Sequence, residues 1–344
     1  MHLILLPIAP FENVFQHLEF LDVVNLASCS RRMENMIMAV SKPFKTGITC
    51  DITLRRSSRT MVLKKENKKD FSWSSHMRRD YWAADSKTFV ERKLDGRVWT
   101  VSPWDSGFRV IGINDTETLR WLKYFKKLFN FHISYLKLEI DHTIFTALFQ
   151  SSQILYSADA IQIVASTLSA PQITNIFDNF YTEKLEISRI PEGYAYEAIV
   201  DRFSKITITP ASWITVPDAW RMAQRCQLIE LQFLETRFNI TQLTWELREF
   251  IQTWLNSDNN LLEYLWISMP SLRINQWSIM EGINHVQGSD KRPEASRYFQ
   301  STIRYSSGCD IQRKDGVIAT ICCNEFLRCG FHFTVWQEAD PSLD

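Results

Sequence analysis

Residues 5–40 carry apolar side chains at the spacing of short amphipathic helices. One helix would place four apolar residues on a single face, namely Phe11, Val14, Phe15 and Leu18. We expect Asp22 to cap a second helix and Ser30 to cap a third, because each side chain precedes an apolar run and can accept a backbone N–H. Helices this short cannot bury all their apolar faces on one another. The pattern therefore predicts an interaction module, and a helical hairpin packed only on its own domain is the alternative.

Residues 46–113 change to short strand patterns separated by polar turns. Strands are predicted at 48–54, 60–65, 71–75, 97–103 and 108–113. Asp95 and Gly96 form a dipeptide that is typical of a hairpin turn. Asp115 then precedes a helical pattern with apolar residues at Leu119, Leu122, Phe125 and Phe129. This part of the chain therefore predicts a small β-rich region followed by a helix.

From residue 135 onward, strand-like runs alternate with helical patterns. The strands are expected at 135–140, 159–164, 183–187, 204–208, 228–231 and 263–267. Their central residues are taken as equivalent: Leu138, Ile161, Leu185, Ile206, Ile229 and Leu265. The first four steps between them are 23, 24, 21 and 23 residues, within the range of about 20–29 that is typical of leucine-rich repeats. Helical patterns lie between the strands, at 142–152, 170–180, 194–203, 217–226 and 242–255. The alternation predicts a curved α/β solenoid, and a non-repetitive α/β domain is the alternative.

Alternate residues of a pleated strand face opposite sides of the sheet. If the central apolar residues point into the core, their neighbours point onto an open sheet face, which is charged near Lys137 and Glu139 and aromatic at its far end. We expect Leu228, Tyr264 and Trp266 to anchor a bound partner on this face, because aromatic side chains dominate the energy of many interfaces. Alanine at Tyr264 and Trp266 would then abolish capture of the partner and leave the fold intact. The alternative is that the C-terminal segment covers Trp266.

The C-terminal part has an antiparallel character. Strand-like runs lie at 296–305, 309–323 and 330–336, and the residues 314–316 predict a hairpin turn. Such a hairpin can close the end of the solenoid. The predicted fold class is therefore α/β, with an N-terminal helical module, a small β-rich segment, and a leucine-rich-repeat-like solenoid closed by a C-terminal β-hairpin.

A known motif emerges from the N-terminal residues Leu6-Pro7, Val14-Phe15, Leu18, Asp22, Leu26 and Cys29-Ser30-Arg31. Together they resemble an F-box, the helical motif that docks onto the Skp-family adaptor of SCF cullin–RING ubiquitin ligases. The resemblance implies that the adaptor is bound by Leu6, Pro7, Val14, Phe15, Leu18 and Leu26. Ala9 stands where an acidic residue often follows the Leu-Pro pair, which weakens a polar contact and leaves the apolar docking surface intact.

Three later runs, at 208–222, 250–267 and 309–321, resemble in this order the F-box-associated domain of the nematode Sdz-33 type. In such proteins the associated domain is the part to which substrate selection is attributed. The predicted domains are an F-box at 1–42, a β-rich linker segment at 43–114, an F-box-associated substrate-recognition domain at 115–337 and a tail at 338–344.

Composition narrows the classes of function. Lys and Arg number 39, as do Asp and Glu, so no global field attracts nucleic acid or an anionic membrane. The 10 glycines argue against cofactor folds that need glycine-rich phosphate loops. Seven cysteines, an odd number among apolar neighbours, predict reduced thiols and a cytoplasmic or nuclear location. No run approaches the roughly 20 apolar residues that a membrane span needs, so we expect no membrane partner.

Basic residues gather between positions 55 and 79. They are Arg55, Arg56, Arg59, Lys64, Lys65, Lys68, Lys69, Arg78 and Arg79. Aromatic side chains lie among them, at Phe71, Trp73, Tyr81 and Trp82, and this mixture also occurs on nucleic-acid-binding surfaces. The solvated, lysine-protected edge of a small sheet explains the cluster more simply, and we do not expect nucleic acid as a partner.

Residues with catalytic or metal-binding chemistry are scattered. Near the C-terminus lie Cys309, Cys322, Cys323, Cys329 and His332, but the paired spacing of structural zinc sites is absent. Asp310 and Arg313 are interpreted as an ion pair at a strand end, and Asp315 as a turn residue. No hydrolase, metalloprotease or nucleotide-binding motif occurs. We therefore assign no catalytic, cofactor or metal residue and expect no enzyme.

The sequence predicts a substrate adaptor of an SCF-type ubiquitin ligase, which would act by holding a protein substrate close to the ubiquitin-conjugating enzyme. One alternative is a leucine-rich-repeat-like interaction scaffold whose degenerate F-box has no ligase partner. Another is nucleic-acid binding through residues 55–79, which would show a steep dependence on salt.

Overall fold

The computed structural model describes residues 14, 17–40, 47–55, 58–65, 71–76, 90–94, 97–104, 107–111, 115–139, 155–165, 168–190, 194, 203–211, 213–233, 239–268, 274–288, 308–324 and 330–336. The chain divides into two compact units. Unit 1 contains Met1–Gln172 and Asn179–Thr182, and unit 2 contains Ile173–Asp178 and Glu183–Asp344. The predicted domain limits stay predictions, and the two units are described one at a time.

Unit 1 contains three complete helices among its described residues: α2 (Phe20–Cys29), α3 (Arg31–Val40) and α4 (Asp115–Phe129). Ser30 caps α3 as expected, because its Oγ accepts a hydrogen bond from the Met33 N–H at 3.1 Å. The expected cap at Asp22 is wrong, since α2 already begins at Phe20 and Asp22 lies in its first turn. The helix expected around residues 11–18 falls mostly outside the described residues.

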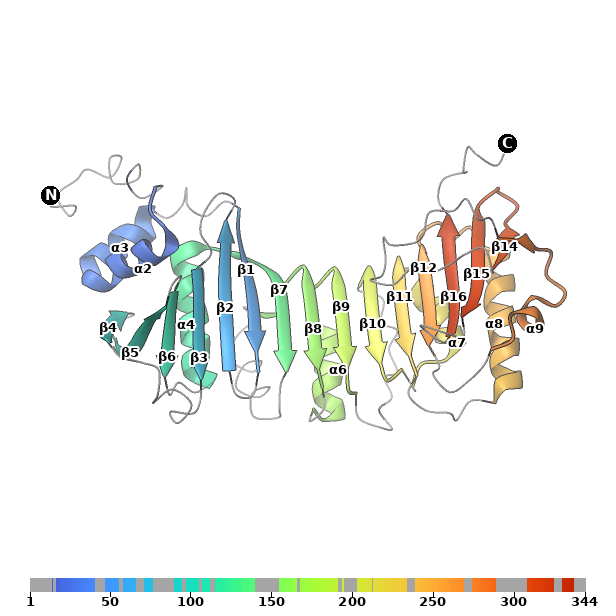
Figure 1. Ribbon diagram of the computed structural model, residues 1–344, viewed down its shortest axis with the longest axis horizontal. Coiled ribbons are helices and arrows are strands. Elements are labelled where there is room, and N and C mark those ends of the chain that lie inside the picture. The colour runs from blue at the N-terminus through green and yellow to red at the C-terminus, as the bar shows by residue number, and fades with distance from the viewer. Residues whose placement is uncertain are drawn as a thin grey trace. The chain divides into compact units, whose positions relative to one another are not determined.

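Among the described residues of unit 1, the sheet has eight strands (Figure 1): β1 (Ile48–Leu54), β2 (Ser58–Lys65), β3 (Phe71–His76), β4 (Val90–Leu94), β5 (Arg97–Trp104), β6 (Gly107–Ile111), β7 (His132–Glu139) and β8 (Ala160–Val164). Their order across the sheet is β8-β7-β1-β2-β3-β6-β5-β4. β1 pairs antiparallel with β2 and parallel with β7, so the β-rich region shares a sheet with the first predicted repeat strand. The five strands expected in the β-rich region are all present. β4, which the pattern did not predict, forms a hairpin with β5.

The core of unit 1 lies between the sheet and α4. Aromatic rings fill it: Trp121 of α4 lies 5.9 Å from Trp73 of β3 and 5.1 Å from Trp99 of β5, measured between ring centroids. Phe129 of α4 meets Phe20 of α2 edge-on at 5.3 Å. Such pairs add about 0.5–1.5 kcal/mol beyond the area that they bury. The contact between Phe20 and Phe129 anchors the N-terminal helices in this core.

β2 lies inside the sheet, between β1 and β3. The expectation that its basic residues protect a sheet edge is therefore wrong. Arg59 is buried on the core face with Met61 and Leu63, whereas Lys64 points away and pairs with Asp51 at 2.6 Å. The pleat thus divides these basic residues between the two faces of the sheet.

The described part of unit 2 also contains eight strands (Figure 1): β9 (Lys184–Ser188), β10 (Lys205–Thr209), β11 (Leu228–Gln232), β12 (Tyr264–Ser268), β13 (Val286–Gln287), β14 (Cys309–Gln312), β15 (Ile318–Asn324) and β16 (Gly330–Trp336). Their order is β13-β14-β15-β16-β12-β11-β10-β9, and the sheet is not closed. β9 to β12 are parallel to one another, and β12, β16, β15 and β14 pair antiparallel. The C-terminal strands thus extend the parallel sheet as a mixed sheet.

The predicted register of the parallel strands is confirmed in unit 2. Leu185 pairs with Ile206, Ile206 with Ile229, and Ile229 with Leu265, and all four side chains are buried. In unit 1 the equivalence is shifted, because Ile161 pairs with Leu136 and not with Leu138. The α/β class is confirmed, while the leucine-rich-repeat solenoid stays a prediction.

Helices connect several of these strands. They are α6 (Ala170–Asn179), of which Ile173–Asp178 belong to unit 2, α7 (Val216–Ala223), α8 (Ile240–Leu255) and α9 (Gln276–Met280). The helix predicted at 242–255 is present as α8, whose buried apolar residues are Leu243, Leu247, Phe250, Ile251 and Trp254. Thr215 and Asp218 form a capping box that begins α7. The helices expected at 142–152 and 194–203 fall mostly outside the described residues.

Candidate functional site

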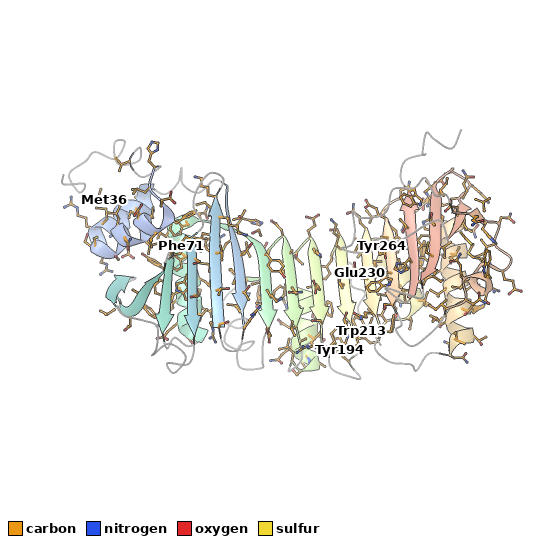
Figure 2. All side chains as sticks on the ribbon, viewed as in Figure 1. Met36, Phe71, Tyr194, Trp213, Glu230 and Tyr264 are labelled. Carbon is orange, nitrogen blue, oxygen red and sulfur yellow. The ribbon has the colours of Figure 1, made fainter. Side chains whose placement is uncertain are left out.

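The two N-terminal helices bury one face and leave another accessible. Their buried residues are Phe20, Val23, Val24 and Ala27 of α2, and Met33, Glu34 and Ile37 of α3. Half-buried apolar side chains remain beside this face, at Leu21, Leu26 and Met36, the last of which is labelled in Figure 2. Partly exposed apolar residues on adjacent helices provide area that a partner can cover.

Three of the predicted adaptor-binding residues lie within the described part of the chain. Val14 is 37% exposed, and Leu18 and Leu26 are half-buried. Leu6, Pro7 and Phe15 lie outside the described residues. None of the three described side chains belongs to the buried core, so each has surface that a partner could cover. Their role in binding stays a prediction.

A second candidate surface is one face of the unit 2 sheet. Side chains opposite the core face align across the strands in two rows. One row joins Lys184, Lys205, Leu228, Tyr264, Thr334 and Thr320. The next joins Glu186, Thr207, Glu230, Trp266, His332 and Cys322, and Figure 2 labels Tyr264 and Glu230 on this sheet. This face is thus charged at β9 and β10 and aromatic at β12, as the pleat argument predicts.

The aromatic end of this face forms a compact cluster. Leu228, Tyr264, Trp266 and Cys322 pack together, and Trp336 lies against them. The Tyr264 hydroxyl and His332 Nδ1 share a hydrogen bond of 2.7 Å. The indole of Trp266 stacks on the His332 ring, with 6.0 Å between centroids and 19° between planes. These contacts tie β11, β12, β15 and β16 to one another.

The three predicted substrate anchors are core residues of this cluster. Leu228 is 7% exposed, Tyr264 0% and Trp266 8%. An anchor must offer surface to its partner, and Tyr264 offers none here. The structure therefore favours the alternative in which the C-terminal strands surround these residues. The expectation that Tyr264→Ala leaves the fold intact has no support from this packing. Substrate binding by the three residues is otherwise untested and stays a prediction.

Hydrogen-bonded polar side chains continue the face on both sides of the cluster. Towards β10, Thr207 donates to Glu230 at 3.2 Å, and Thr209 donates to Gln232 at 3.2 Å. Towards β14, the buried Thr320 hydroxyl donates to Asp310 at 2.5 Å and accepts the Trp336 indole N–H at 2.8 Å, within the described residues. The signal for these residues is the alternation of polar with apolar positions in the strands, but it does not tell which polar side chains are buried.

A buried arginine joins the hairpin between β14 and β15 to the loop after α8. The Arg313 side chain is 1% exposed and forms a two-point ion pair with Asp315, whose oxygens lie 3.0 and 2.5 Å from Nε and an η nitrogen. It also donates to the Asn259 carbonyl at 2.6 Å and to Asn260, and its guanidinium lies 5.0 Å from the centre of the Trp254 ring. The predicted pairing of Arg313 with Asp310 is therefore wrong.

We expect the Asp315 contact to make stability depend on pH in acid. The hydrogen bonds from Arg313 lower the pKa of the Asp315 carboxyl below its ordinary value of about 3.9. A pKa lowered by folding contributes stability above the ordinary value, and this contribution is lost as the pH falls through the folded-state value. In urea titrations, wild type should thus exceed Asp315→Asn in stability at neutral pH, and this difference should shrink as the pH falls below the ordinary carboxyl pKa of about 3.9. The control is Asp258→Asn, which removes an exposed carboxylate of unit 2. If the stability difference between wild type and Asp315→Asn does not change with pH, the ion pair with Arg313 is not its cause.

The cysteines near the C-terminus are divided between two faces of the sheet. Cys322 packs with Tyr264 and Trp266, whereas Cys309 accepts a hydrogen bond from Gln276 of α9 at 3.0 Å. The same Gln276 accepts the Cys323 backbone N–H at 3.0 Å. Burial raises the pKa of the Cys309 and Cys323 thiols, so both stay protonated at neutral pH and are poor nucleophiles. Cys329 lies outside the described residues.

Two of the four aromatic residues considered for nucleic-acid binding are buried. Phe71 and Trp73 are buried against α4, where Phe71 lies 5.6 Å from Phe125 and Trp73 lies 5.9 Å from Trp121 (ring centroids). They are therefore not available to stack on bases. Tyr81 and Trp82 lie outside the described residues. Nucleic-acid binding stays an alternative prediction, and Phe71 and Trp73 no longer support it.

None of the helices in the described ranges has both the length and the apolar character that crossing a bilayer requires.

Comparison with known protein families finds an F-box domain at residues 3–45. No curated protein and no solved structure matches the chain. The matched residues contain α2 and α3, which are the helices predicted from the apolar pattern and anchored through Phe20. The N-terminal part of this chain is therefore an F-box domain, which suggests an adaptor role of the SCF type in general.

Proposed function

We propose that the protein is a non-catalytic substrate-recognition adaptor of an SCF-type cullin–RING ubiquitin ligase. The observation that carries the proposal is the F-box domain at residues 3–45. Two further features support it. The domain is anchored in unit 1 through Phe20 and Phe129, and Val14, Leu18 and Leu26 lie outside the buried core. An adaptor needs this combination of a rigid attachment and an accessible apolar surface.

The proposal assigns docking onto a Skp-family adaptor, and through it onto a cullin, to Leu6, Pro7, Val14, Phe15, Leu18 and Leu26. We also propose that residues 115–337 form an F-box-associated domain of the Sdz-33 type. Substrate binding is assigned to the face of the unit 2 sheet that carries the two rows of side chains opposite the core. Glu230 is half-buried and lies next to the cluster that contains Trp266, so it offers surface where Tyr264 does not.

Capture of a Skp-family adaptor by the full chain tests the proposal. We expect Val14→Asp to weaken binding about 100-fold, because a carboxylate forced into an apolar interface without a partner costs several kcal/mol. The measurement is the dissociation constant for the purified adaptor, by calorimetry.

Val98→Asp is the matched control, since Val98 is also an exposed valine of unit 1, 62% exposed, but lies outside the F-box. We expect it to bind the adaptor as wild type does. If the folded wild-type chain does not bind at all, the F-box has no ligase partner, and the alternative of an interaction scaffold takes the place of the proposal.

A further inference from the structure

Two arginines occupy the first turn of α3. Arg31 and Arg32 directly follow Ser30, whose hydroxyl caps the helix through the Met33 N–H. Both side chains are exposed. Within the described part of the chain, neither of them makes a hydrogen bond, an ion pair or a ring contact. Both charges are therefore accessible to solvent, and neither contributes a contact to the fold among the described residues.

The position of these charges is unfavourable for the helix. The N-terminal end of a helix carries a partial positive charge, so acidic residues favour it and basic residues oppose it. Two adjacent cations in the first turn also repel each other. The acid in this turn is Glu34, which is buried, so it does not neutralise the exposed surface. Local stability thus gives no reason for arginine at either position.

The arginines follow closely, in the sequence, a helix that carries one of the residues assigned to the adaptor. Leu26 is in the last turn of α2, which ends at Cys29, and the chain passes through Ser30 directly to Arg31. An apolar patch with charges at its border is the usual composition of a protein interface. A nucleic-acid surface would instead need base-stacking aromatics, and the residues of α2 and α3 include one aromatic residue, the buried Phe20.

We propose that Arg31 and Arg32 form a basic rim of the docking surface and pair with carboxylates of the Skp-family adaptor. This inference rests on the proposed function and adds the chemistry that the partner must present. The guanidinium group suits this role because it binds a carboxylate at two points. Charges at the rim of an interface mainly speed association and make affinity depend on salt.

The test is a charge reversal, Arg31→Glu with Arg32→Glu, in the full chain. We expect at least a tenfold weaker affinity for the purified adaptor, caused mainly by slower association. Wild-type affinity should fall as salt rises from 50 to 500 mM, and the variant should lose most of this dependence. The same substitutions place carboxylates in the first turn of α3, so the thermal midpoint should stay level or rise. Weaker binding by a protein that is at least as stable cannot result from misfolding.

The matched control is Arg120→Glu with Lys127→Glu, which makes the same change in charge on exposed positions of α4. It should leave adaptor affinity within twofold of wild type. Equal affinity of wild type and the Arg31/Arg32 variant overturns the inference and leaves the proposed function standing. Wild type that does not bind the adaptor overturns both. Binding of a DNA oligonucleotide that depends on the two arginines, without any effect on the adaptor, assigns them to nucleic acid and also overturns the inference.

Discussion

Replacing Tyr264 with alanine should lower the free energy of unfolding of unit 2 by about 3–5 kcal/mol. The side chain is fully buried between β11 and β16, so its removal leaves a cavity in the middle of the sheet face. The hydroxyl also binds His332 Nδ1 at 2.7 Å, and the loss of this bond leaves the buried imidazole with an unmet polar atom. A loss of this size is a large part of the 5–15 kcal/mol that a typical domain possesses. Urea unfolding followed by circular dichroism measures it.

Tyr264→Phe separates the two contributions. It keeps the ring and removes only the hydroxyl, so we expect a loss of about 1 kcal/mol. If Tyr264→Ala is as stable as wild type, the side chain is not part of the core. In that case Tyr264 could again be interpreted as a substrate anchor on an open sheet face.

Replacing Arg313 with alanine should cost unit 2 about 2–3 kcal/mol, because Asp315 is partly exposed and its charge stays solvated. The guanidinium is buried, and its loss leaves Asp315 without its ion pair and the Asn259 carbonyl without its donor. The ring of Trp254 also loses the cation that lies above it. Thermal and urea unfolding of the full chain report this loss.

Two further variants make the Arg313 prediction specific. Arg313→Lys keeps the charge but cannot reproduce the two-point contact, so we expect it to recover only part of the loss. Arg225→Ala removes an exposed arginine of the same unit and should change stability by less than about 0.5 kcal/mol. An Arg313→Ala variant within 1 kcal/mol of wild type would mean that Arg313 does not link the hairpin to the loop after α8.

Local patterns were sufficient to predict the parallel strands of unit 2. Leu185, Ile206, Ile229 and Leu265 each lie at the centre of a short apolar run, and their pairing is confirmed. A run with two apolar positions on the same face does not fix which of them is the equivalent one. The apolar pattern therefore fits Leu138 as well as Leu136, and the structure pairs Leu136 with Ile161.

Features that depend on distant partners could not be predicted in this way. Nothing in residues 263–267 shows that β16, some seventy positions later in the sequence, pairs with β12 and helps to bury Tyr264. β4 was missed because Val90–Leu94 carries charges where an alternating strand would show apolar residues. The position of Arg313 and Asp310 near a strand end predicts that they pair with each other. In the structure the turn at Gly316, with φ +91°, brings Asp315 back to Arg313 instead.

The F-box was predictable because its signal is local. The spacing of apolar residues in α2 and the Ser30 cap of α3 lie within a few residues of each other, and the family comparison finds the domain at residues 3–45. Binding of a partner is not a property of such a pattern alone. It depends on which side chains the rest of unit 1 leaves exposed, and Val14 and Leu26 remain accessible.

Retention of the full chain on an immobilised cullin tests the central claim most directly. The chain is applied alone, with a purified Skp-family adaptor, and with the adaptor and the Val14→Asp variant in place of wild type. The account predicts retention of wild type only when the adaptor is present, in equal molar amounts with it, and little retention of the variant. Absence of wild-type retention, while the adaptor itself binds the cullin and the chain is folded, would contradict the assignment of this protein to an SCF-type ligase.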